Sequence, residues 1–316
     1  MHDVVIIGSG PAGCTAAIFA VRRNLKTLVL SDPVELSLAE EATVVDDWPG
    51  EPGIRGMELV KKFREHAKKL GAELKEEKVT GLEKSGDCFS IKTKDNEYVG
   101  KSIILATGAK HRKGLIKGED ELAGKGVSYC ASCDAPLYKG KRVIVLGGGD
   151  TAVSYALLLE QVGARTTLVH RRDELRAAEA WQSKLKKSSV EILWDTVCLE
   201  IKGKQKVESV VLLNKKTQQK TEMKVDGVFV AFGVIPTSEI ARNVGVNVDR
   251  NGYIEVDREQ RTSVPCIFAA GDCCNNPSKK IVTAAGDGAI AAESAYNYIK
   301  ALSHPIPNTS MKNPML

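Results

Sequence analysis

Residues 3–20, DVVIIGSGPAGCTAAIFA, carry the pattern from which the fold can be predicted. The run DVVII is short, continuous and apolar, which is typical of a strand buried on both faces of a sheet. A glycine turn follows it, then an alanine-rich stretch of helical length from Ala12 to about Arg23, then the apolar segment KTLVLS at residues 26–31. A strand, a glycine turn, a helix and a second strand form a βαβ unit of a doubly wound parallel sheet.

The same unit occurs a second time in the chain. Residues 142–146 (RVIVL) are followed by the turn GGGDTA, the helical stretch AVSYALLLEQVG and the strand ARTTLVH, which ends at residue 170. Two such units favour an α/β fold with two doubly wound, Rossmann-like dinucleotide-binding domains far more strongly than one glycine motif would.

Each turn places small residues where a dinucleotide needs them. The first glycine permits the tight turn, the second lets the backbone approach a pyrophosphate, and the third position must be small so that helix packs on strand. Backbone N–H groups at the start of the helix then hold the phosphates. These positions are Gly8, Gly10 and Gly13 in the first copy and Gly147, Gly149 and Ala152 in the second.

Further strands extend both units. Apolar segments at 102–109 and 227–236 each end in glycine, and alternating patterns predict an inserted β-meander within 76–99 and another within 190–224. Near the C-terminus, CIFAAGDCC predicts a strand ending at Gly271-Asp272, followed by a small-residue helix over 284–299. This element has no counterpart in the second half, so we expect it to complete the first domain. We expect the proline-rich stretch 303–316 to be a loosely ordered tail.

The second unit carries cations where its second strand ends. An acidic residue there would bind the ribose 2′-hydroxyl of NAD and repel a phosphate. The chain instead has His170, Arg171 and Arg172, with Arg176 one helical turn beyond. Guanidinium groups match a phosphate monoester in charge and geometry, so this set favours NADPH over NADH. A surface arginine cluster is the alternative.

The first unit ends its second strand with LSDP. Ser31 or Asp32 could therefore meet the ribose of an adenosine. Asp32 as a turn residue before Pro33 explains the sequence equally well.

Eight cysteines are scattered along the chain and do not form a disulfide framework. Apolar or strand-like surroundings predict small buried side chains at four of them. These four are Cys14, Cys88, Cys198 and Cys266.

The segment GVSYCASCDAPLY, residues 126–138, places Cys130 and Cys133 two residues apart. That spacing can close a disulfide ring, and a thiol at the start of a helix can be activated. Asp134 could move the proton that dithiol chemistry requires. A metal site would need further ligands, for which adjacent Cys273-Cys274 are poor candidates. Two buried structural cysteines are the remaining alternative.

Length and charge set the broad class. A chain of 316 residues suits about two domains, and a formal charge of +5 is mild. Basic clusters at 110–113 and 184–187 lack interleaved aromatic residues, which favours solvated faces over an acidic protein partner and gives no support for nucleic-acid binding. We predict neither a signal peptide nor a membrane span and expect a cytoplasmic protein.

With these motifs in place, the chain resembles the low-molecular-weight thioredoxin reductases from about residue 3 to residue 300. The most specific stretches are GVSYCASCDAPLYKGKRVIVLGGGDTA (126–152) and VHRRDELRA (169–177). The resemblance implies an FAD domain formed by 1–113 and 244–316, and an NADPH domain, 114–243, that carries the CxxC pair. It also implies a homodimer, a rotation between domains during turnover, and a thioredoxin or glutaredoxin-like protein as substrate.

The resemblance assigns roles to individual residues. Cys133 is then the sulfur nearer the flavin, Cys130 the thiolate that attacks the substrate disulfide, and Asp134 the acid/base residue. The aspartate that binds the flavin ribitol matches Asp272. The FAD positions implied are Gly8, Ser9, Gly10, Pro11, Ala12, Gly13, Asp32, Asp47, Val79, Gly108, Gly271, Asp272, Lys279, Lys280 and Ile281. The NADPH positions are Gly147, Gly149, Asp150, Thr151, Ala152, His170, Arg171, Arg172 and Arg176.

Four departures from the family pattern stand out. The usual GGQL-like loop is replaced by LSLAE at 36–40, an asparagine by Asp47, an Arg-Gln-Ala segment by residues 279–281, and paired glutamates by Ser154-Tyr155. The first three surround the implied FAD site, and the last lies on the nicotinamide side, which leaves room for another electron donor. Relatives that use ferredoxin or a reduced deazaflavin are expected to lose the glycine turn or the arginines, and this chain keeps both.

Other functions remain open at this level. The same fold could reduce another dithiol carrier or a small disulfide. A cysteine–metal electron-transfer or sensor protein built on the nucleotide-binding fold is the alternative from another class, and metal analysis would separate it.

Overall fold

A computed structural model describes residues 1–42, 45 and 47–303 of the chain. The described residues form two compact units, the first comprising 1–41, 45, 47–110 and 235–303 and the second 42 and 111–234. Two short strands, β7 (Ala109–His111) and β16 (Val234–Pro236), pair where the chain passes between the units. The predicted tail lies outside the described residues from 304 onward.

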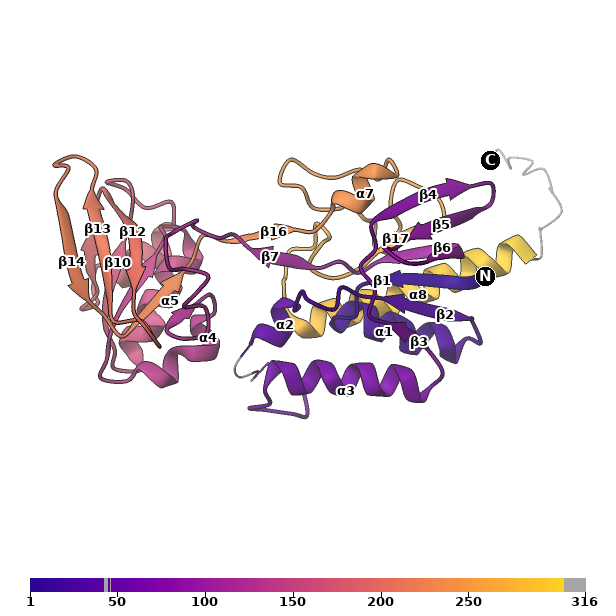
Figure 1. The fold of residues 1–316 in the computed structure, drawn as a ribbon, viewed down its shortest axis with the longest axis horizontal. Helices are drawn as coiled ribbons and strands as arrows, with labels where there is room; N and C mark the ends of the chain where they lie inside the picture. The colour runs from indigo at the N-terminus through magenta and orange to yellow at the C-terminus, as the bar shows by residue number, and fades with distance from the viewer. Residues whose placement is uncertain (43–44, 46, 304–316) are drawn as a thin grey trace, which may run out of the picture. The chain divides into compact units, whose positions relative to one another are not determined.

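The first unit is built on one sheet with strand order β3-β2-β1-β6-β5-β4, and β17 also pairs with β6 (Figure 1). Alternate residues of β1 belong to two different cores: Val4 and Ile6 pack with the helices α1 (Pro11–Arg22) and α8 (Ile281–Ser303), and Val5 and Ile7 pack in the core on the opposite face of the sheet. The continuous apolar run DVVII thus serves a strand covered on both faces. The strands are β1 (His2–Ile7), β2 (Thr27–Leu30), β3 (Glu73–Lys75), β4 (Gly81–Ser85), β5 (Cys88–Lys92), β6 (Glu97–Leu105) and β17 (Ile267–Ala269).

Small residues allow the two main helices of this unit to approach closely. A Cβ added to Gly288 would lie 2.1 Å from the carbonyl oxygen of Ala12, so α8 passes directly over the start of α1. The helices are α1 (Pro11–Arg22), α2 (Leu38–Glu41), α3 (Gly56–Lys69), α7 (Glu239–Asn243) and α8 (Ile281–Ser303).

Strand register brings four loops to one edge of this sheet. Ile7 pairs with Leu30 on one side and with Leu105 on the other, and Leu105 pairs with Ala269. All four strands are parallel, so the residues that follow them emerge at a common carboxyl edge, where open α/β sheets bind ligands.

The second unit has an all-parallel sheet of order β11-β10-β9-β15-β8 and a separate antiparallel sheet β12-β13-β14. Helix α5 packs on one face of the parallel sheet, and the antiparallel sheet contributes to the core on the other. The strands are β8 (Val127–Ser128), β9 (Arg142–Leu146), β10 (Arg165–Val169), β11 (Glu191–Leu193), β12 (Thr196–Lys202), β13 (Ser209–Asn214), β14 (Lys220–Lys224) and β15 (Gly227–Val230), and the helices are α4 (Ala131–Asp134), the 3₁₀ turn η1 (Ala135–Tyr138), α5 (Asp150–Gln161) and α6 (Glu179–Leu185).

These elements confirm the predicted βαβ units and show one difference in the inserted β-meanders. The β-rich insert of the first unit extends the main sheet, with β5 antiparallel to β6, whereas that of the second unit forms its own sheet. The predicted return of the C-terminal strand to the first unit is confirmed by the pairing of β17 with β6.

The units divide after Lys110 and Val234, whereas the sequence placed boundaries after residues 113 and 243. Packing explains the second difference, because Ala241 of α7 and Val246 are buried in the core of the first unit.

Candidate dinucleotide and disulfide sites

The first glycine turn has the shape that its sequence predicts. Gly8 has φ +111°, and a Cβ there would lie 2.2 Å from the carbonyl oxygen of Ala106. A Cβ on Gly13 would lie 1.9 Å from the carbonyl oxygen of Gly8, so helix and strand are in backbone contact. Beside Gly10, which caps α1, the nearest atom to an added Cβ is 3.6 Å away. The first and third glycines are therefore required by the protein's own packing, while the second leaves space in which a pyrophosphate can approach.

Asp272 follows β17 at the same edge and is largely withdrawn from water. Burial raises the pKa of its carboxyl above the ordinary value, nearby Asp287 adds to this, and Lys279 opposes it. No described residue donates a hydrogen bond to the Asp272 carboxylate. A withdrawn carboxylate without a donor fits a position that meets ligand hydroxyl groups.

Asp287 is a residue that sequence reasoning missed. From α8, its Oδ2 accepts hydrogen bonds from the backbone N–H of Gly271 (3.3 Å) and from Asn276 Nδ2 (2.7 Å). Gly271 has φ +82°, and an added Cβ would lie 2.9 Å from the Ala12 Cβ. Asp287 thus holds the turn that presents Asp272. The sequence signal for Asp287 is weak, since an aspartate among the small residues at the start of this helix belongs to no motif.

Three further predicted FAD positions, Asp32, Val79 and Gly108, differ in their contacts and burial. Asp32 accepts a hydrogen bond from the backbone N–H of Val34 at 2.9 Å and pairs with Lys78 at 2.9 Å, which supports the turn interpretation. The Lys78 hydrogen bond lowers the pKa of Asp32. Val79 is buried in the core, and Gly108 has φ +66° with open space around it.

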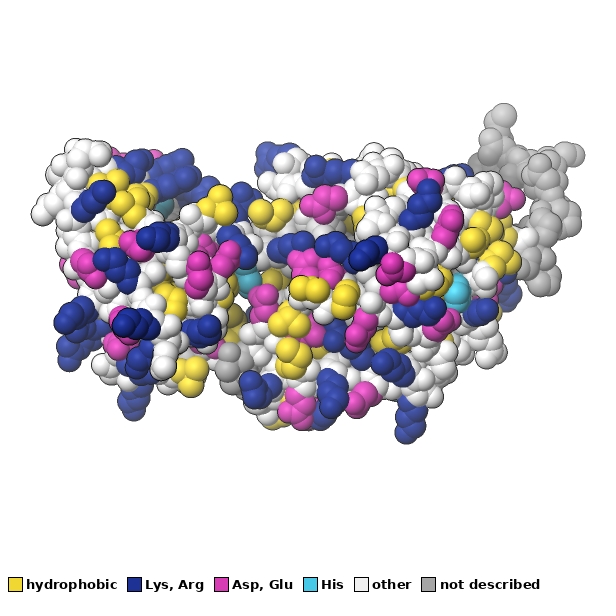
Figure 2. All heavy atoms as spheres, viewed as in Figure 1, with side chains coloured by type: hydrophobic (Ala, Val, Ile, Leu, Met, Phe, Trp, Pro, Cys, Tyr) yellow, Lys and Arg dark blue, Asp and Glu magenta, His cyan; other side chains and the backbone are white. Residues whose placement is uncertain are grey.

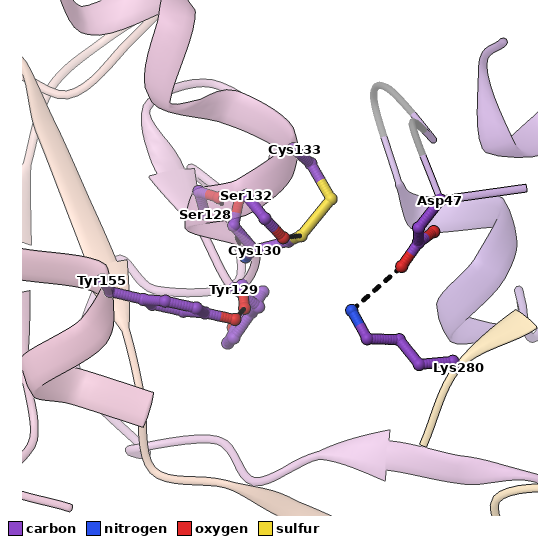
Figure 3. The surroundings of a disulfide bond; sticks show 8 residues. All are labelled: Asp47, Ser128, Tyr129, Cys130, Ser132, Cys133, Tyr155 and Lys280. Atoms are coloured by element: carbon purple, nitrogen blue, oxygen red, sulfur yellow. Dashed lines mark hydrogen bonds and ion pairs between the residues drawn. A yellow bond between two sulfur atoms is a disulfide. The ribbon is translucent and has the colours of Figure 1, made fainter. Parts of the chain in front are cut away.

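Two departures from the family pattern meet in space within the first unit. Lys280 Nζ lies 3.0 Å from Asp47 Oδ2, and both side chains are more than half exposed (Figure 3). The carboxylate that replaces the usual asparagine is therefore matched by a lysine. Lys279 instead contacts the Cys274 carbonyl oxygen and lies over the Tyr253 ring, 4.4 Å from its centroid. Ile281 begins α8.

The second glycine turn repeats the geometry of the first. Gly147 has φ +157°, and a Cβ there would lie 2.7 Å from the Cβ of Ala152, which is buried. Around Gly149 there is nothing within 4 Å of an added Cβ. Asp150 and Thr151 are exposed at the start of α5.

Two hydrogen bonds fasten the arginine-bearing segment to this turn. The Gly148 carbonyl accepts from the backbone N–H of Arg176 at 2.8 Å, and Asp150 Oδ1 accepts from the N–H of Ala178 at 2.7 Å. Arg171, Arg172 and Arg176 are exposed, and none of them forms an ion pair with a described residue. The structure therefore gathers three uncompensated guanidinium groups beside an open glycine turn.

His170 has a different place from the arginines. Its side chain is 5% exposed, and Nδ1 lies 2.9 Å from the Gly147 carbonyl oxygen. A Cβ on Gly148 would come within 2.1 Å of the imidazole ring. The His170 ring packs against the turn and is buried there. The cations that a phosphate can reach are therefore the exposed arginines.

Cys130 and Cys133 form a disulfide, with sulfurs 2.06 Å apart (Figure 3). Strand β8 ends at Ser128, and Phe229 of β15 pairs with it, so the motif emerges at the same carboxyl edge as the second glycine turn. Cys130 is half-buried, whereas Cys133 is 7% exposed at the first turn of α4. The Ser132 hydroxyl lies 3.3 Å from Cys130 Sγ. The two sulfurs thus differ in access to an external reactant.

Asp134 and Tyr155 lie close behind the disulfide segment. Asp134 Oδ1 is buried and has no hydrogen-bond partner among the described residues. Tyr155, which replaces a usual glutamate, donates to the Tyr129 carbonyl oxygen at 3.0 Å (Figure 3). Burial raises the pKa of Tyr155, and the Asp134 charge adds to the shift. Ser154 donates to the Thr151 carbonyl oxygen within α5.

The other cysteines are free thiols. Cys14 and Cys266 are buried as expected, whereas Cys88 and Cys198 are half-buried. Cys273 and Cys274 are fully buried, with sulfurs 3.8 Å apart. Within the described ranges, no group of three His, Cys, Asp or Glu side chains is arranged to hold a metal ion.

The predicted basic clusters lie on the surface and are interspersed with acids. Lys110 pairs with Glu35, Lys113 with Asp120 and Lys186 with Glu179. Figure 2 shows dark blue and magenta side chains mixed over the visible face of each unit. In the described part of the chain, no helix has both the length and the apolar character needed to cross a bilayer.

Two sheets whose central strands are parallel, each with a glycine turn, and a disulfide at the binding edge of one define a dinucleotide-binding protein that exchanges electrons with thiols. The chain belongs to the pyridine nucleotide-disulphide oxidoreductase family, whose model matches residues 2–288.

Known proteins are similar over nearly the whole length. The thioredoxin reductase of Bacillus subtilis (strain 168) is 39% identical over 308 residues, which cover 97% of each chain. That of Treponema pallidum (strain Nichols) is 40% identical over 96% of this chain and 99% of its own. The crystal structure of the Streptococcus pyogenes thioredoxin reductase matches with a TM-score of 0.82 at 38% identity, covering 95% and 99% of the two chains. The predicted resemblance, the fold class and the assignment to flavoprotein-type disulfide oxidoreductases are confirmed.

Proposed function

We propose that the chain is an NADPH-dependent thioredoxin reductase that contains FAD and uses Cys130–Cys133 as its redox pair. The disulfide at the carboxyl edge of the sheet that bears GGGDTA is the observation that carries this proposal. The full-length similarity to thioredoxin reductases supports the substrate class. We further propose a homodimer that acts in the cytoplasm on a thioredoxin or glutaredoxin-like protein.

The residues fit two dinucleotides. In the first unit, Ser9, Gly10, Pro11 and Ala12 would hold the FAD pyrophosphate at the start of α1, and Asp272 would meet the ribitol. In the second, Gly147 and Gly149 would admit the NADPH pyrophosphate, and the arginines would hold its 2′-phosphate. This assigns FAD to the first unit and NADPH to the second. Bound FAD would supply hydride acceptance from NADPH and two-electron donation to the disulfide.

The chain's own residues account for the thiol steps. Two electrons and two protons open the Cys130–Cys133 bond to a dithiol. The more accessible Cys130 then attacks, as thiolate, one sulfur of the substrate disulfide, and Cys133 attacks the mixed disulfide, releasing the substrate dithiol and reforming the pair. Asp134, with an unpartnered buried oxygen beside this segment, is placed to take and return the proton of a leaving or entering thiol.

Anaerobic titration of the purified protein tests the proposal. NADPH is added while the flavin spectrum is recorded, followed by thioredoxin in its disulfide form. We expect bleaching that consumes two hydride equivalents, one for flavin and one for disulfide, and recovery on addition of thioredoxin. Slow bleaching by NADPH together with rapid bleaching by reduced ferredoxin or deazaflavin would contradict the proposal that NADPH is the electron donor. Recovery of the flavin spectrum with the disulfide form of another carrier, but not with thioredoxin, would contradict the proposal that thioredoxin is the substrate.

A further inference from the structure

One of the loops that depart from the family pattern, LSLAE at 36–40, contains a buried carboxylate. Within LSLAE, Ser37 and Glu40 form a capping box at the short helix α2, and Glu40 Oε2 accepts from the Ser37 backbone N–H (2.9 Å) and hydroxyl (2.8 Å). The Glu40 side chain is 2% exposed. A carboxylate so withdrawn from water needs a cationic partner.

That partner is Arg64 of α3. Its Nη1 lies 2.8 Å from Glu40 Oε1, on the oxygen that the capping box leaves free. Its Nε donates to Ser9 Oγ at 3.0 Å and to the Ser9 carbonyl oxygen at 3.3 Å. A continuous chain of contacts thus runs from the substituted loop through Arg64 to the first glycine turn.

Ser9 stands beside Gly10, where α1 begins and where the FAD pyrophosphate is expected. Ser9 is 4% exposed, while the Arg64 side chain is 34% exposed and so reaches from the buried carboxylate toward solvent. No described residue shares a hydrogen bond with Arg64 Nη2. A guanidinium fixed at one end and free at the other is prepared for a phosphate, because little conformational freedom remains to be lost on binding.

We propose that Arg64, oriented by Glu40, is a positioning residue for the FAD pyrophosphate. Its guanidinium fixes the turn at Ser9 and brings a positive charge to the phosphates. The inference rests on the proposed function, since it names a further residue of the same FAD site. It also gives the unusual loop a role: Glu40 supplies the charge that holds Arg64. The competing explanation is a purely structural link between α2, α3 and the turn.

FAD binding to the apoprotein distinguishes these explanations. The variants are Arg64→Met and Glu40→Gln, with Lys68→Met as the matched control, because Lys68 is an exposed cation one turn further along α3. We expect the Kd for FAD, measured by flavin fluorescence, to rise about tenfold in Arg64→Met, as for one lost charge-assisted hydrogen bond. Glu40→Gln should raise it about threefold, and Lys68→Met should leave it unchanged.

A second ligand separates phosphate binding from folding. The Kd for ADP, which carries the pyrophosphate without the flavin, should rise by the same factor in Arg64→Met, and its salt dependence should weaken. Unchanged FAD and ADP affinities, or a lower unfolding temperature without an affinity change, would overturn the inference. If Arg64→Met does not fold, Arg64→Lys and Glu40→Gln decide by the same criteria. Wild-type protein that binds neither FAD nor ADP would instead contradict the proposed function.

Discussion

Replacing Arg171 and Arg172 together by alanine should narrow the preference for NADPH over NADH. Both side chains are exposed beside the open turn at Gly149 and have no ion-pair partner in the described part of the chain. Their removal therefore breaks no internal interaction, and the free energy of unfolding should change by less than about 0.5 kcal/mol.

The size of the effect follows from exposure. A buried hydrogen bond to a charged group contributes about 1.5–3 kcal/mol, but exposed ion pairs contribute at most about 1 kcal/mol because water and salt screen them. Two guanidinium groups on one phosphate then contribute about 2 kcal/mol, which corresponds to roughly a 30-fold change in selectivity.

The assay compares kcat/KM for NADPH and for NADH with oxidised thioredoxin as acceptor. We expect a roughly 30-fold loss with NADPH and less than about a twofold change with NADH, because NADH lacks the phosphate. Lys204→Ala with Lys206→Ala is the control, since it removes two exposed cations from the hairpin between β12 and β13. Equal losses with both donors, or an unchanged ratio, would refute the assignment of the phosphate site.

Three further predictions concern other parts of the site. Cys133→Ser should leave flavin reduction by NADPH intact and abolish thioredoxin reduction; surviving turnover would show that the electron path is wrong. Gly13→Ala should destabilise the first unit by about 3 kcal/mol or more, because its Cβ would overlap the Gly8 carbonyl oxygen, and thermal unfolding of the apoprotein at wild-type temperature would contradict this. Asp272→Asn should stabilise the apoprotein, because folding raises the pKa of this carboxyl above 3.8. The wild-type protein therefore loses stability as pH rises through the folded-state pKa and the buried carboxyl ionises. The gain in unfolding temperature in the variant should accordingly be larger at pH 8 than at pH 4. A gain that is independent of pH would argue against a buried charge at Asp272.

Local patterns were sufficient to predict the two βαβ units. The run DVVII and the turn GSGPAG are contiguous, and the backbone constraints at Gly8 and Gly13 arise within one strand–turn–helix. The Cys130–Cys133 disulfide was predictable for the same reason, because two residues of spacing determine whether the ring can close. The arginine set could be predicted because it directly follows the second strand of the second βαβ unit.

Packing between distant elements decided the rest. Asp287 contacts the Gly271 turn, and Lys280 contacts Asp47, only because α8 packs against α1 and the sheet of the first unit. The pairing of Glu40 with Arg64 depends on how α2 and α3 meet, which the capping box at Ser37 does not encode. His170 is next to Arg171 in sequence, yet only the arginine is exposed. The His170 ring is buried against Gly148, and its Nδ1 lies 2.9 Å from the Gly147 carbonyl oxygen. Sequence periodicity specifies the conformation of one element at a time, whereas these contacts depend on strand register and helix packing, and so appear only in the assembled tertiary structure.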